Sequence, residues 1–176
     1  TAISERDQGD SHDPLLEECK QHIVFCQNKC KGFQGRDDIL QKMKVYITGK
    51  GEQPLVIHGT SGCGKTSLMA MAAQLTKTEW ADNSAVIIRF LGTTPDSSLI
   101  GPLLKSLNSQ IRQIYGYDKT SMETLDELKE EFQTCFDLPI NDVPLVIFLD
   151  SLDQLGAIHG GRSLSWLPEQ FSGNIK

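Results

Sequence analysis

The feature that most constrains this chain is a glycine-rich stretch enclosed by apolar residues, PLVIHGTSGCGKTSLM, at positions 54–69. Residues 55–58 are typical of a buried strand, and the residues after the glycines carry the apolar spacing of a helix. Between them the chain reads G-x-x-x-x-G-K-T from Gly59 to Thr66, which is the phosphate-loop pattern. A glycine-rich turn is the alternative, but a chance match has odds of about one per cent or less. The strand before the loop and the helix after it favour phosphate binding further.

Each part of this loop has a physical task in holding phosphate. Glycines allow positive φ and turn backbone N–H groups inward as a nest for anions. The helix that follows adds free N–H groups and the positive end of its dipole. Lys65 would reach the β and γ phosphates, and the Thr66 hydroxyl would ligate Mg²⁺. Cys63 is interpreted as a small side chain tolerated in the loop rather than as a redox centre. The predicted nucleotide-binding residues of the loop are Gly59, Thr60, Ser61, Gly62, Cys63, Gly64, Lys65, Thr66 and Ser67.

A second motif, PLVIFLDSLDQL, places an acid at the end of an apolar run. Asp150 in this position is typical of the acid that holds Mg²⁺ in phosphate-loop NTPases. Asp153 would orient or deprotonate the attacking water, or would cap the next turn. We therefore predict Asp150 and Asp153 as catalytic residues, with Thr66 and Asp150 as metal ligands. Residues 153–156 also fit the D-x-x-G pattern of GTPases, but the sequence has no guanine-reading [NT]-K-x-D tetrapeptide, which favours ATP/ADP over GTP.

Three apolar runs that alternate with helical patterns predict the fold class. The runs 55–58, 84–91 and 143–150 are expected to be strands of one parallel sheet, because strands separated by helices pair through right-handed crossovers. The prediction is an α/β three-layer sandwich. Ligands of such sheets bind at the carboxyl ends of the strands, where both the glycine loop and Asp150 are expected.

The chain divides into a polar lead-in (1–13, expected to be disordered), a helical segment (14–49) and a phosphate-loop NTPase core (50–176). Helices are expected at 14–31, around 39–49, at 65–80, at 99–116 and, opened by a capping box of Thr120 and Glu123, through Phe136.

Composition excludes some classes of function. The longest apolar run, 145–149, is far too short to span a bilayer. A net charge of −6 argues against non-specific nucleic-acid binding. Five cysteines without a C-x-x-C pair indicate reduced thiols, so we expect a cytoplasmic location with no nucleic-acid or membrane partner. Cys19, Cys26 and Cys30 could form a metal cluster, but they fall at helical spacing with Leu15 and are interpreted as an apolar stripe.

Four segments, GFQGRDDIL, HGTSGCGKTSLM, RFLGTTPDSS and LVIFLDSLDQL, together resemble a NACHT domain. This is the ATPase module of the signal-transduction (STAND) branch of AAA+-like proteins, and the similarity is greatest to NACHT proteins that carry WD repeats. The resemblance spans roughly residues 14–170. It implies that Gly35 and Arg36 lie against the adenine side of a bound nucleotide, and that Asp150 and Asp153 are the acids of an extended Walker B signature.

The resemblance implies an ATP/ADP switch rather than a motor, because Gln154 stands where the signature usually continues into Glu. Such a module would act with other domains of a longer chain and could self-associate through the NTPase module. The rival hypotheses are a small-molecule kinase, with its acceptor site in GTTPDSS or residues 156–163, and a scaffold that never hydrolyses its nucleotide. Arg89 and Arg162 are candidates to sense phosphate or a neighbour, or else form surface ion pairs.

In the fold that the chain resembles, a further strand after Asp150 lies between the phosphate-loop strand and the strand that ends at Asp150. The remaining sequence offers only SLSWLPEQF and SGNIK, with no apolar run of strand length. We therefore expect an NTPase core that is incomplete at its C-terminus, with weaker nucleotide binding or hydrolysis than a longer chain would have.

Overall fold

The computed structural model describes residues 13–94, 96–137, 143–171 and 174–176, so most of the predicted disordered lead-in lies outside the described residues. Two strands, β1 (Ala85–Phe90) and β2 (Leu145–Asp150), form a parallel pair with Ala85 opposite Leu145 and Phe90 opposite Asp150. Both were predicted from their continuous apolar runs. The helices are α1 (Pro14–Cys30), α2 (Asp37–Thr48), α3 (Lys65–Leu75), α4 (Ile100–Ile114) and α5 (Leu125–Thr134), joined by short 3-10 and π turns.

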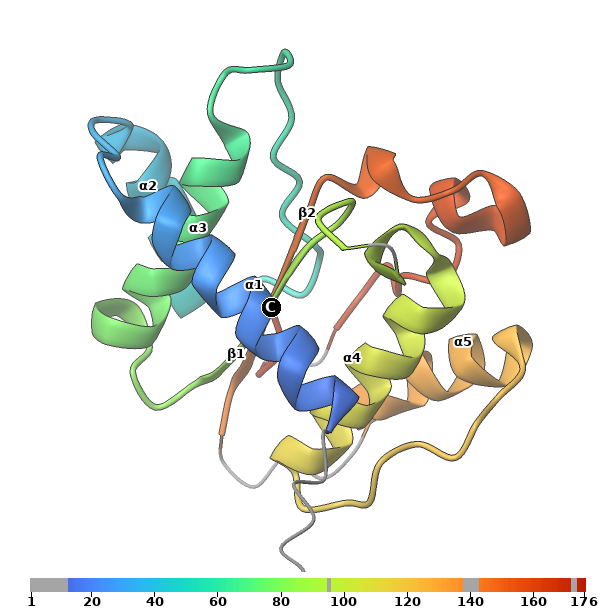
Figure 1. Cartoon of the computed structure of the whole chain (residues 1–176). Helices are drawn as coiled ribbons and strands as arrows, with labels where there is room; N and C mark the ends of the chain where they lie inside the picture. The colour runs from blue at the N-terminus through green and yellow to red at the C-terminus, as the bar shows by residue number, and fades with distance from the viewer. Residues whose placement is uncertain (1–12, 95, 138–142, 172–173) are drawn as a thin grey trace, which may run out of the picture.

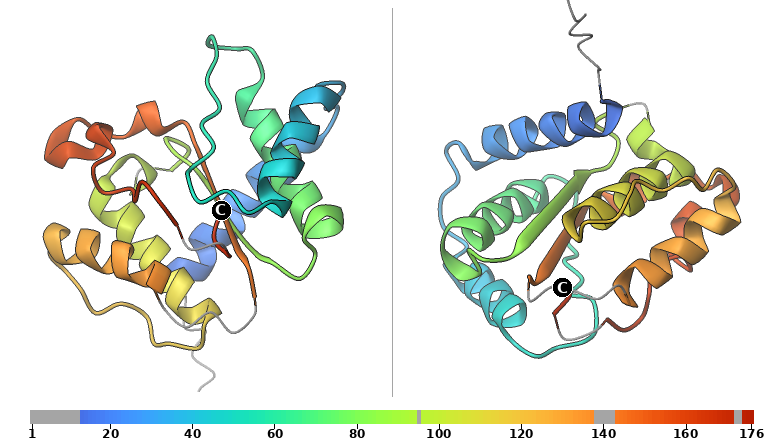
Figure 2. Two further views of the ribbon diagram at one scale, coloured as in Figure 1. Left: turned by 180° about the vertical axis from the view of Figure 1, so that it is seen from behind. Right: turned by 90° about the horizontal axis from the view of Figure 1, so that it is seen from below.

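Helices cover both faces of the strand pair, as Figures 1 and 2 show. Side chains alternate along the strands: Ile87 and Leu145 pack in the core beneath α4 and α5, whereas Ile88 and Phe148 pack in the core beneath α1, α2 and α3. This arrangement agrees with an α/β fold. The wider sheet of the predicted sandwich is not shown, because only two strands are paired in the part of the chain that is described.

The helix ends follow capping chemistry. Asp13 accepts a hydrogen bond from the Leu15 amide (3.1 Å) and Pro14 occupies the first helical position, so α1 begins where the sequence predicts. The predicted capping box of Thr120 and Glu123 is wrong. The box is formed by Thr124 and Glu127 at the start of α5.

The prediction of a strand at residues 55–58 is also wrong. Residues 54–60 have no regular secondary structure, and Val56 is 74% exposed. The sequence pattern indicated a buried strand, but a strand exists only where a neighbour accepts its backbone hydrogen bonds. No described segment pairs with these residues in that way.

The end of the chain lies along the edge of β2 that faces away from β1. The Leu145 amide donates to the carbonyl of Asn174 (2.9 Å), the Lys176 amide donates to Leu145 (2.9 Å), and the Ile147 amide donates to Lys176 (2.7 Å). On the other side the Lys176 ammonium donates to the Gly51 carbonyl. Residues 174–176 therefore lie between β2 and the segment before the glycine loop, joined to β2 by one parallel bridge. The sequence did not predict this bridge.

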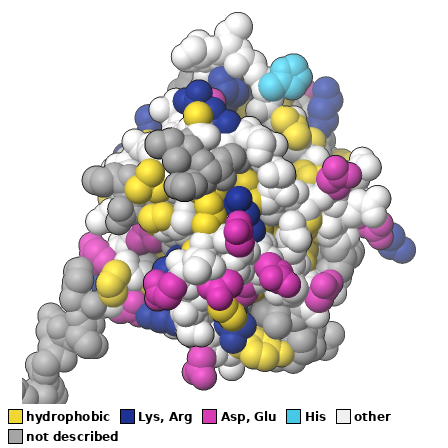
Figure 3. Space-filling model, turned by 90° about the vertical axis from the view of Figure 1, so that its right-hand side faces the viewer, with side chains coloured by type: hydrophobic (Ala, Val, Ile, Leu, Met, Phe, Trp, Pro, Cys, Tyr) yellow, Lys and Arg dark blue, Asp and Glu magenta, His cyan; other side chains and the backbone are white. Residues whose placement is uncertain are grey.

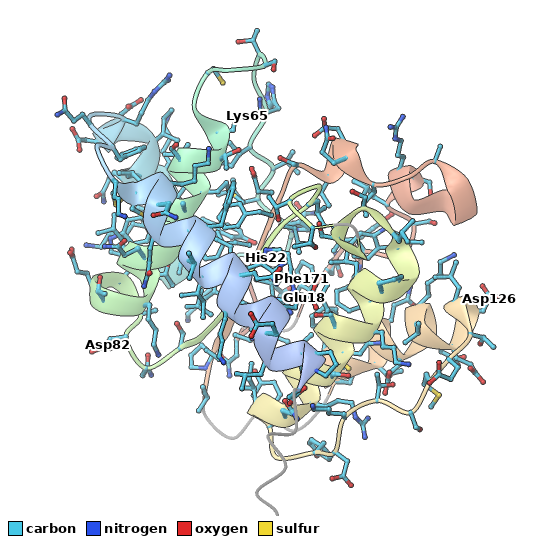
Figure 4. The ribbon with its side chains drawn as sticks, in the orientation of Figure 1. Glu18, His22, Lys65, Asp82, Asp126 and Phe171 are labelled. Carbon is cyan, nitrogen blue, oxygen red and sulfur yellow. The ribbon has the colours of Figure 1, made fainter. Side chains whose placement is uncertain are left out.

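The surface is acidic over α5. Figure 3 shows Asp and Glu side chains gathered on the right-hand face of the molecule, and Figure 4 places Asp126 at the outer end of α5. The first turn of α5 also holds Glu127, and acidic side chains in this position complement the positive end of the helix dipole. No described helix combines the length and the apolarity that a membrane span needs.

Candidate phosphate-binding site

The backbone of the glycine loop has the conformation that its glycines were predicted to allow. Gly62 and Gly64 adopt φ values of 77° and 91°, a region that other residues rarely occupy. Gly59 is constrained by space instead, because a Cβ there would lie 3.0 Å from the Sγ atom of Cys63. Lys65 begins α3 directly after this loop. The N-terminal amides of α3 therefore lie next to the left-handed glycines, as an anion site requires.

The Lys65 ammonium lies within the loop. Its Nζ atom donates to the carbonyl oxygens of Gly59 and Thr60, both at 2.9 Å. Figure 4 shows Lys65 at the start of α3, close to the glycine loop at the top of the molecule. Its hydrogen-bond partners are neutral, so the positive charge is available to an anion.

The two predicted metal ligands meet across the structure. The Thr66 hydroxyl donates to Asp150 Oδ2 at 2.8 Å, although the two residues are 84 positions apart in the chain. The Ser151 hydroxyl donates to the same oxygen at 3.1 Å. Asp150 is buried at the carboxyl end of β2, and the amide of Leu91 donates to its carbonyl at 3.1 Å. The strand pair and α3 thus bring a hydroxyl and a carboxylate into direct contact.

Asp153 and Gln154 follow in a 3-10 turn after β2. The Gln154 amide donates to Asp153 Oδ2 at 2.9 Å, and both side chains are exposed. Together with Lys65, Thr66 and Asp150 they line a cavity of about 900 Å³. This volume is within the range of small-molecule sites. A role for Asp153 in orienting water stays a prediction.

Gly35 and Arg36 connect α1 to α2, and both have left-handed backbone conformations, with φ of 74° and 63°. The Arg36 Nη2 atom donates to the carbonyl of Cys63 at 3.1 Å. The structure thus places Arg36 against the phosphate loop. Contact with an adenine ring remains a prediction for both residues.

Arg89 does not form the surface ion pair considered from the sequence, because it is 1% exposed. Its guanidinium donates to the Gln110 side chain (2.7 Å) and the Ser106 hydroxyl (2.9 Å) of α4. Glu18 of α1 lies 3.8 Å from its Nε atom. Arg162, in contrast, is exposed and donates to the Leu155 carbonyl at 2.9 Å.

Sequence reasoning missed the polar cluster in which the half-buried Glu18 lies beside the buried His22 and Arg89. His22 Nδ1 accepts the amide of Phe90 at 3.2 Å, so α1 caps the outer edge of β1 (Figure 4). Burial raises the pKa of Glu18, but His22, Ser106 and the charge of Arg89 outweigh it and hold that pKa below its ordinary value. The sequence feature that could have revealed this cluster is the four-residue spacing of Glu18 and His22, which places both on the inward face of α1.

The cysteines are free thiols. Burial raises the pKa of Cys26 and of Cys135 to about 12 in each case, so both thiols stay protonated at neutral pH. Cys26 lies on the buried face of α1 with His22, whereas Ile23 of the same helix is 52% exposed. No group of three or more potential ligands with metal-binding geometry occurs among the described residues.

Taken together, the structure combines a parallel strand pair, a left-handed glycine loop that opens α3, and a strand-end acid in contact with the loop threonine, an arrangement compatible with an α/β fold. Comparison with known proteins gives a narrower assignment. The chain is 29% identical over 162 residues to NACHT domain- and WD repeat-containing protein 1 of Homo sapiens, which covers 88% of this chain. It is 31% identical over 166 residues, or 89% of this chain, to NACHT and WD repeat domain-containing protein 2 of Mus musculus. It is a NACHT-like segment.

The matched region is a small part of these relatives. The chain spans about a tenth of the length of each, 10% in both cases. No protein-family model matches the chain, and no solved structure is significantly similar to it. The similarity to the two relatives agrees with the resemblance to NACHT proteins with WD repeats.

Proposed function

We propose that this chain is the nucleotide-binding part of a Mg²⁺-dependent ATP/ADP switch, with slow ATPase activity, within a larger intracellular signalling or scaffold protein. The observation that carries the proposal is the 2.8 Å hydrogen bond from Thr66 to Asp150. Two motifs that were predicted separately, from a glycine loop and from an acid ending a strand, are in contact. The similarity to much longer NACHT proteins supports the assignment to a multidomain protein.

The residues present fit magnesium. Thr66 and Asp150 offer hydroxyl and carboxylate oxygens, which are the hard ligands that Mg²⁺ takes in phosphate sites. When bound there, the ion would neutralise charge on phosphate oxygens. The Ser151 hydroxyl supports this role because it donates to the same Asp150 oxygen. Its removal should weaken metal binding without abolishing it.

The residues also fit a polyphosphate. Lys65 is a cation bonded to two neutral carbonyls, and a phosphate oxygen is a stronger acceptor for its N–H groups than either carbonyl. The first amides of α3 have no side-chain cap, so they are available to a ligand. In this proposal the backbone amides, Lys65 and the helix dipole bind and orient the phosphate.

Slow turnover is part of the proposal. Asp153 is the carboxylate nearest in sequence to Asp150 that could position or deprotonate water, and its Oδ2 atom already accepts the Gln154 amide. Gln154 carries no charge and cannot itself take a proton at neutral pH. Because Gln154 in the Asp153–Gln154 pair is an amide, we expect the nucleotide-bound state to be long-lived and hydrolysis to be slow.

The test is binding of ATP to the whole chain with Mg²⁺ and with chelator, followed by thermal unfolding. A ligand that binds only the folded state raises the unfolding temperature, so ATP with Mg²⁺ should stabilise the unsubstituted chain. Lys65→Ala should abolish that shift, whereas the matched exposed lysine variant Lys42→Ala should keep it. An unchanged shift in folded Lys65→Ala would contradict the proposal.

Turnover measurements separate the rivals. The switch hypothesis predicts slow phosphate release in a single-turnover assay, abolished by Asp153→Asn. Stimulation of ATP consumption by one small acceptor would indicate a kinase. Tight binding with no hydrolysis at all would indicate a nucleotide-stabilised scaffold.

A further inference from the structure

Arg36 is held in an unfavourable backbone conformation while its side chain reaches the phosphate loop. Its φ of 63° and ψ of 24° place it in the left-handed region, which costs a non-glycine residue free energy. The preceding residue, Gly35, is left-handed as well. The guanidinium crosses to a loop 27 positions away and donates to the Cys63 carbonyl at 3.1 Å. The turn between α1 and α2 thus brings a cation to the back of the loop.

This contact fixes a peptide group that matters for anion binding. The peptide between Cys63 and Gly64 is planar and trans, so its C=O and N–H bonds point in opposite directions. When Arg36 holds the carbonyl on one side, the Gly64 amide must face the other. Gly64 is the N-cap of α3 and has no side chain to restrict its rotation, with φ at 91°. Backbone hydrogen bonds hold the neighbouring groups, from the Cys63 amide to Thr60 and from the Leu68 amide to the Gly64 carbonyl, and Arg36 adds the side-chain bond to the Cys63 carbonyl itself.

Arg36 acts from outside the cavity. It is not among the residues lining the 900 Å³ cavity that Lys65 and Thr66 line. Among the described residues no carboxylate forms an ion pair with Arg36. A cation behind the loop that holds a carbonyl away from the ligand favours a phosphate on the opposite side.

We propose that Arg36 is a positioning residue for phosphate, which orients the Gly64 amide by holding the Cys63 carbonyl. The inference rests on the proposed function. A positioning role for Arg36 differs from contact with the adenine ring in one measurable way. A residue that acts through the loop backbone affects every polyphosphate ligand equally, whatever base the ligand carries.

The experiment is calorimetric titration of the whole chain with ATP, GTP and inorganic tripolyphosphate. In Arg36→Gln the affinity for all three ligands should fall by a similar factor, about tenfold, which is the effect of one charge-assisted hydrogen bond. Arg36→Lys should recover part of the loss, since an ammonium can donate to the same carbonyl. Lys31→Gln removes a nearby exposed positive charge that bonds to Asn28 rather than to the loop, and should leave all three affinities unchanged.

Arg36→Gly separates positioning from folding. Glycine adopts the left-handed conformation without steric strain but loses more backbone entropy on folding, so this variant should unfold at about the temperature of the unsubstituted chain while losing phosphate affinity as Arg36→Gln does. A loss confined to ATP, with tripolyphosphate binding intact, would overturn the inference and assign Arg36 to the base. Affinities equal to those of Lys31→Gln would also overturn it. Failure of the unsubstituted chain to bind any of the three ligands would overturn the proposed function itself, and this inference with it.

Discussion

Replacing Ile175 with alanine tests whether the end of the chain belongs to the folded core. This side chain is 1% exposed and packs in the cluster that contains Leu145, Phe132 and Trp166. The substitution removes three carbons, which at about 0.8 kcal/mol per buried CH₂ is roughly 2.4 kcal/mol of transfer free energy. A residual cavity adds to this, within the usual range of about 2–5 kcal/mol for such truncations. We expect the free energy of unfolding to fall by about 3 kcal/mol.

Removing residues 174–176 altogether should cost more. It deletes Ile175 and also the three backbone hydrogen bonds that join these residues to Leu145 and Ile147. At about 1 kcal/mol each, these bonds bring the expected loss to roughly 6 kcal/mol. This loss is a large part of the stability of a typical domain, which is about 5–15 kcal/mol.

Urea unfolding followed by tryptophan fluorescence is a suitable assay, because Trp166 is buried in the same cluster as Ile175. Asn174→Ala is the matched control: the Asn174 side chain is exposed, and its backbone carbonyl, which accepts from Leu145, is retained. This control should change stability by less than about 0.5 kcal/mol. If Ile175→Ala and Asn174→Ala unfold at the same urea concentration with the same slope, the segment is not packed against β2 and the reasoning fails.

Three further predictions concern the cap of α5, the base of the nucleotide and the half-buried carboxylate of Glu18. Thr124→Ala should lower the free energy of unfolding by about 1 kcal/mol, because it removes the side chain that caps α5; no change in urea unfolding would contradict the cap. ATP should bind more tightly than GTP in competition titration, since no guanine-reading tetrapeptide is present, and tighter GTP binding would overturn this preference. The pKa of Glu18 is lowered on folding, so its contribution is present at neutral pH and is lost as pH falls from the ordinary value of 4.5 through the folded-state pKa. Glu18→Gln should therefore reduce the drop in unfolding temperature between pH 5 and pH 3, and an unaltered acid profile would refute that assignment.

The contacts of the site could be predicted from the sequence where one motif constrains another. Thr66 follows a loop that must open a helix, and Asp150 ends a continuous apolar run that must be a buried strand. The sequence placed both residues at the carboxyl ends of parallel strands. The two side chains do meet, at 2.8 Å, although residues 55–58 before the loop are not a strand. Both strands of the observed pair, β1 and β2, were predicted from their continuous apolar runs.

The errors arise where local sequence does not determine the partner. Thr120 and Glu123 have the spacing of a capping box, yet Thr120 bonds to the buried Glu131 while Glu123 pairs with Lys105. The sequence left Arg89 as a candidate to sense phosphate or a neighbour, or as a member of a surface ion pair, and neither alternative placed it in the interior, where isolated charges are costly to bury. Its burial is possible only because α1 and α4, which are distant in sequence, supply polar partners. Nothing in the residues adjacent to Arg89 indicates those partners.

The apolar residues 55–58 show how the fold and the site depend on each other. In β2, Leu145 and Ile147 direct their amides away from β1 and towards residues 174–176, so Leu149 is the next residue on that edge. No backbone hydrogen bond joins Leu149 to a further strand in the described part of the chain. Leu55 and Val56, exposed by 43% and 74%, line the same cavity as Leu149, Lys65 and Thr66. An extended segment placed beside Leu149 would give β2 a hydrogen-bonded neighbour on each of its two edges. Such a segment would end next to the phosphate loop. We therefore predict that a segment that completes the sheet at this groove also raises the affinity for nucleotide.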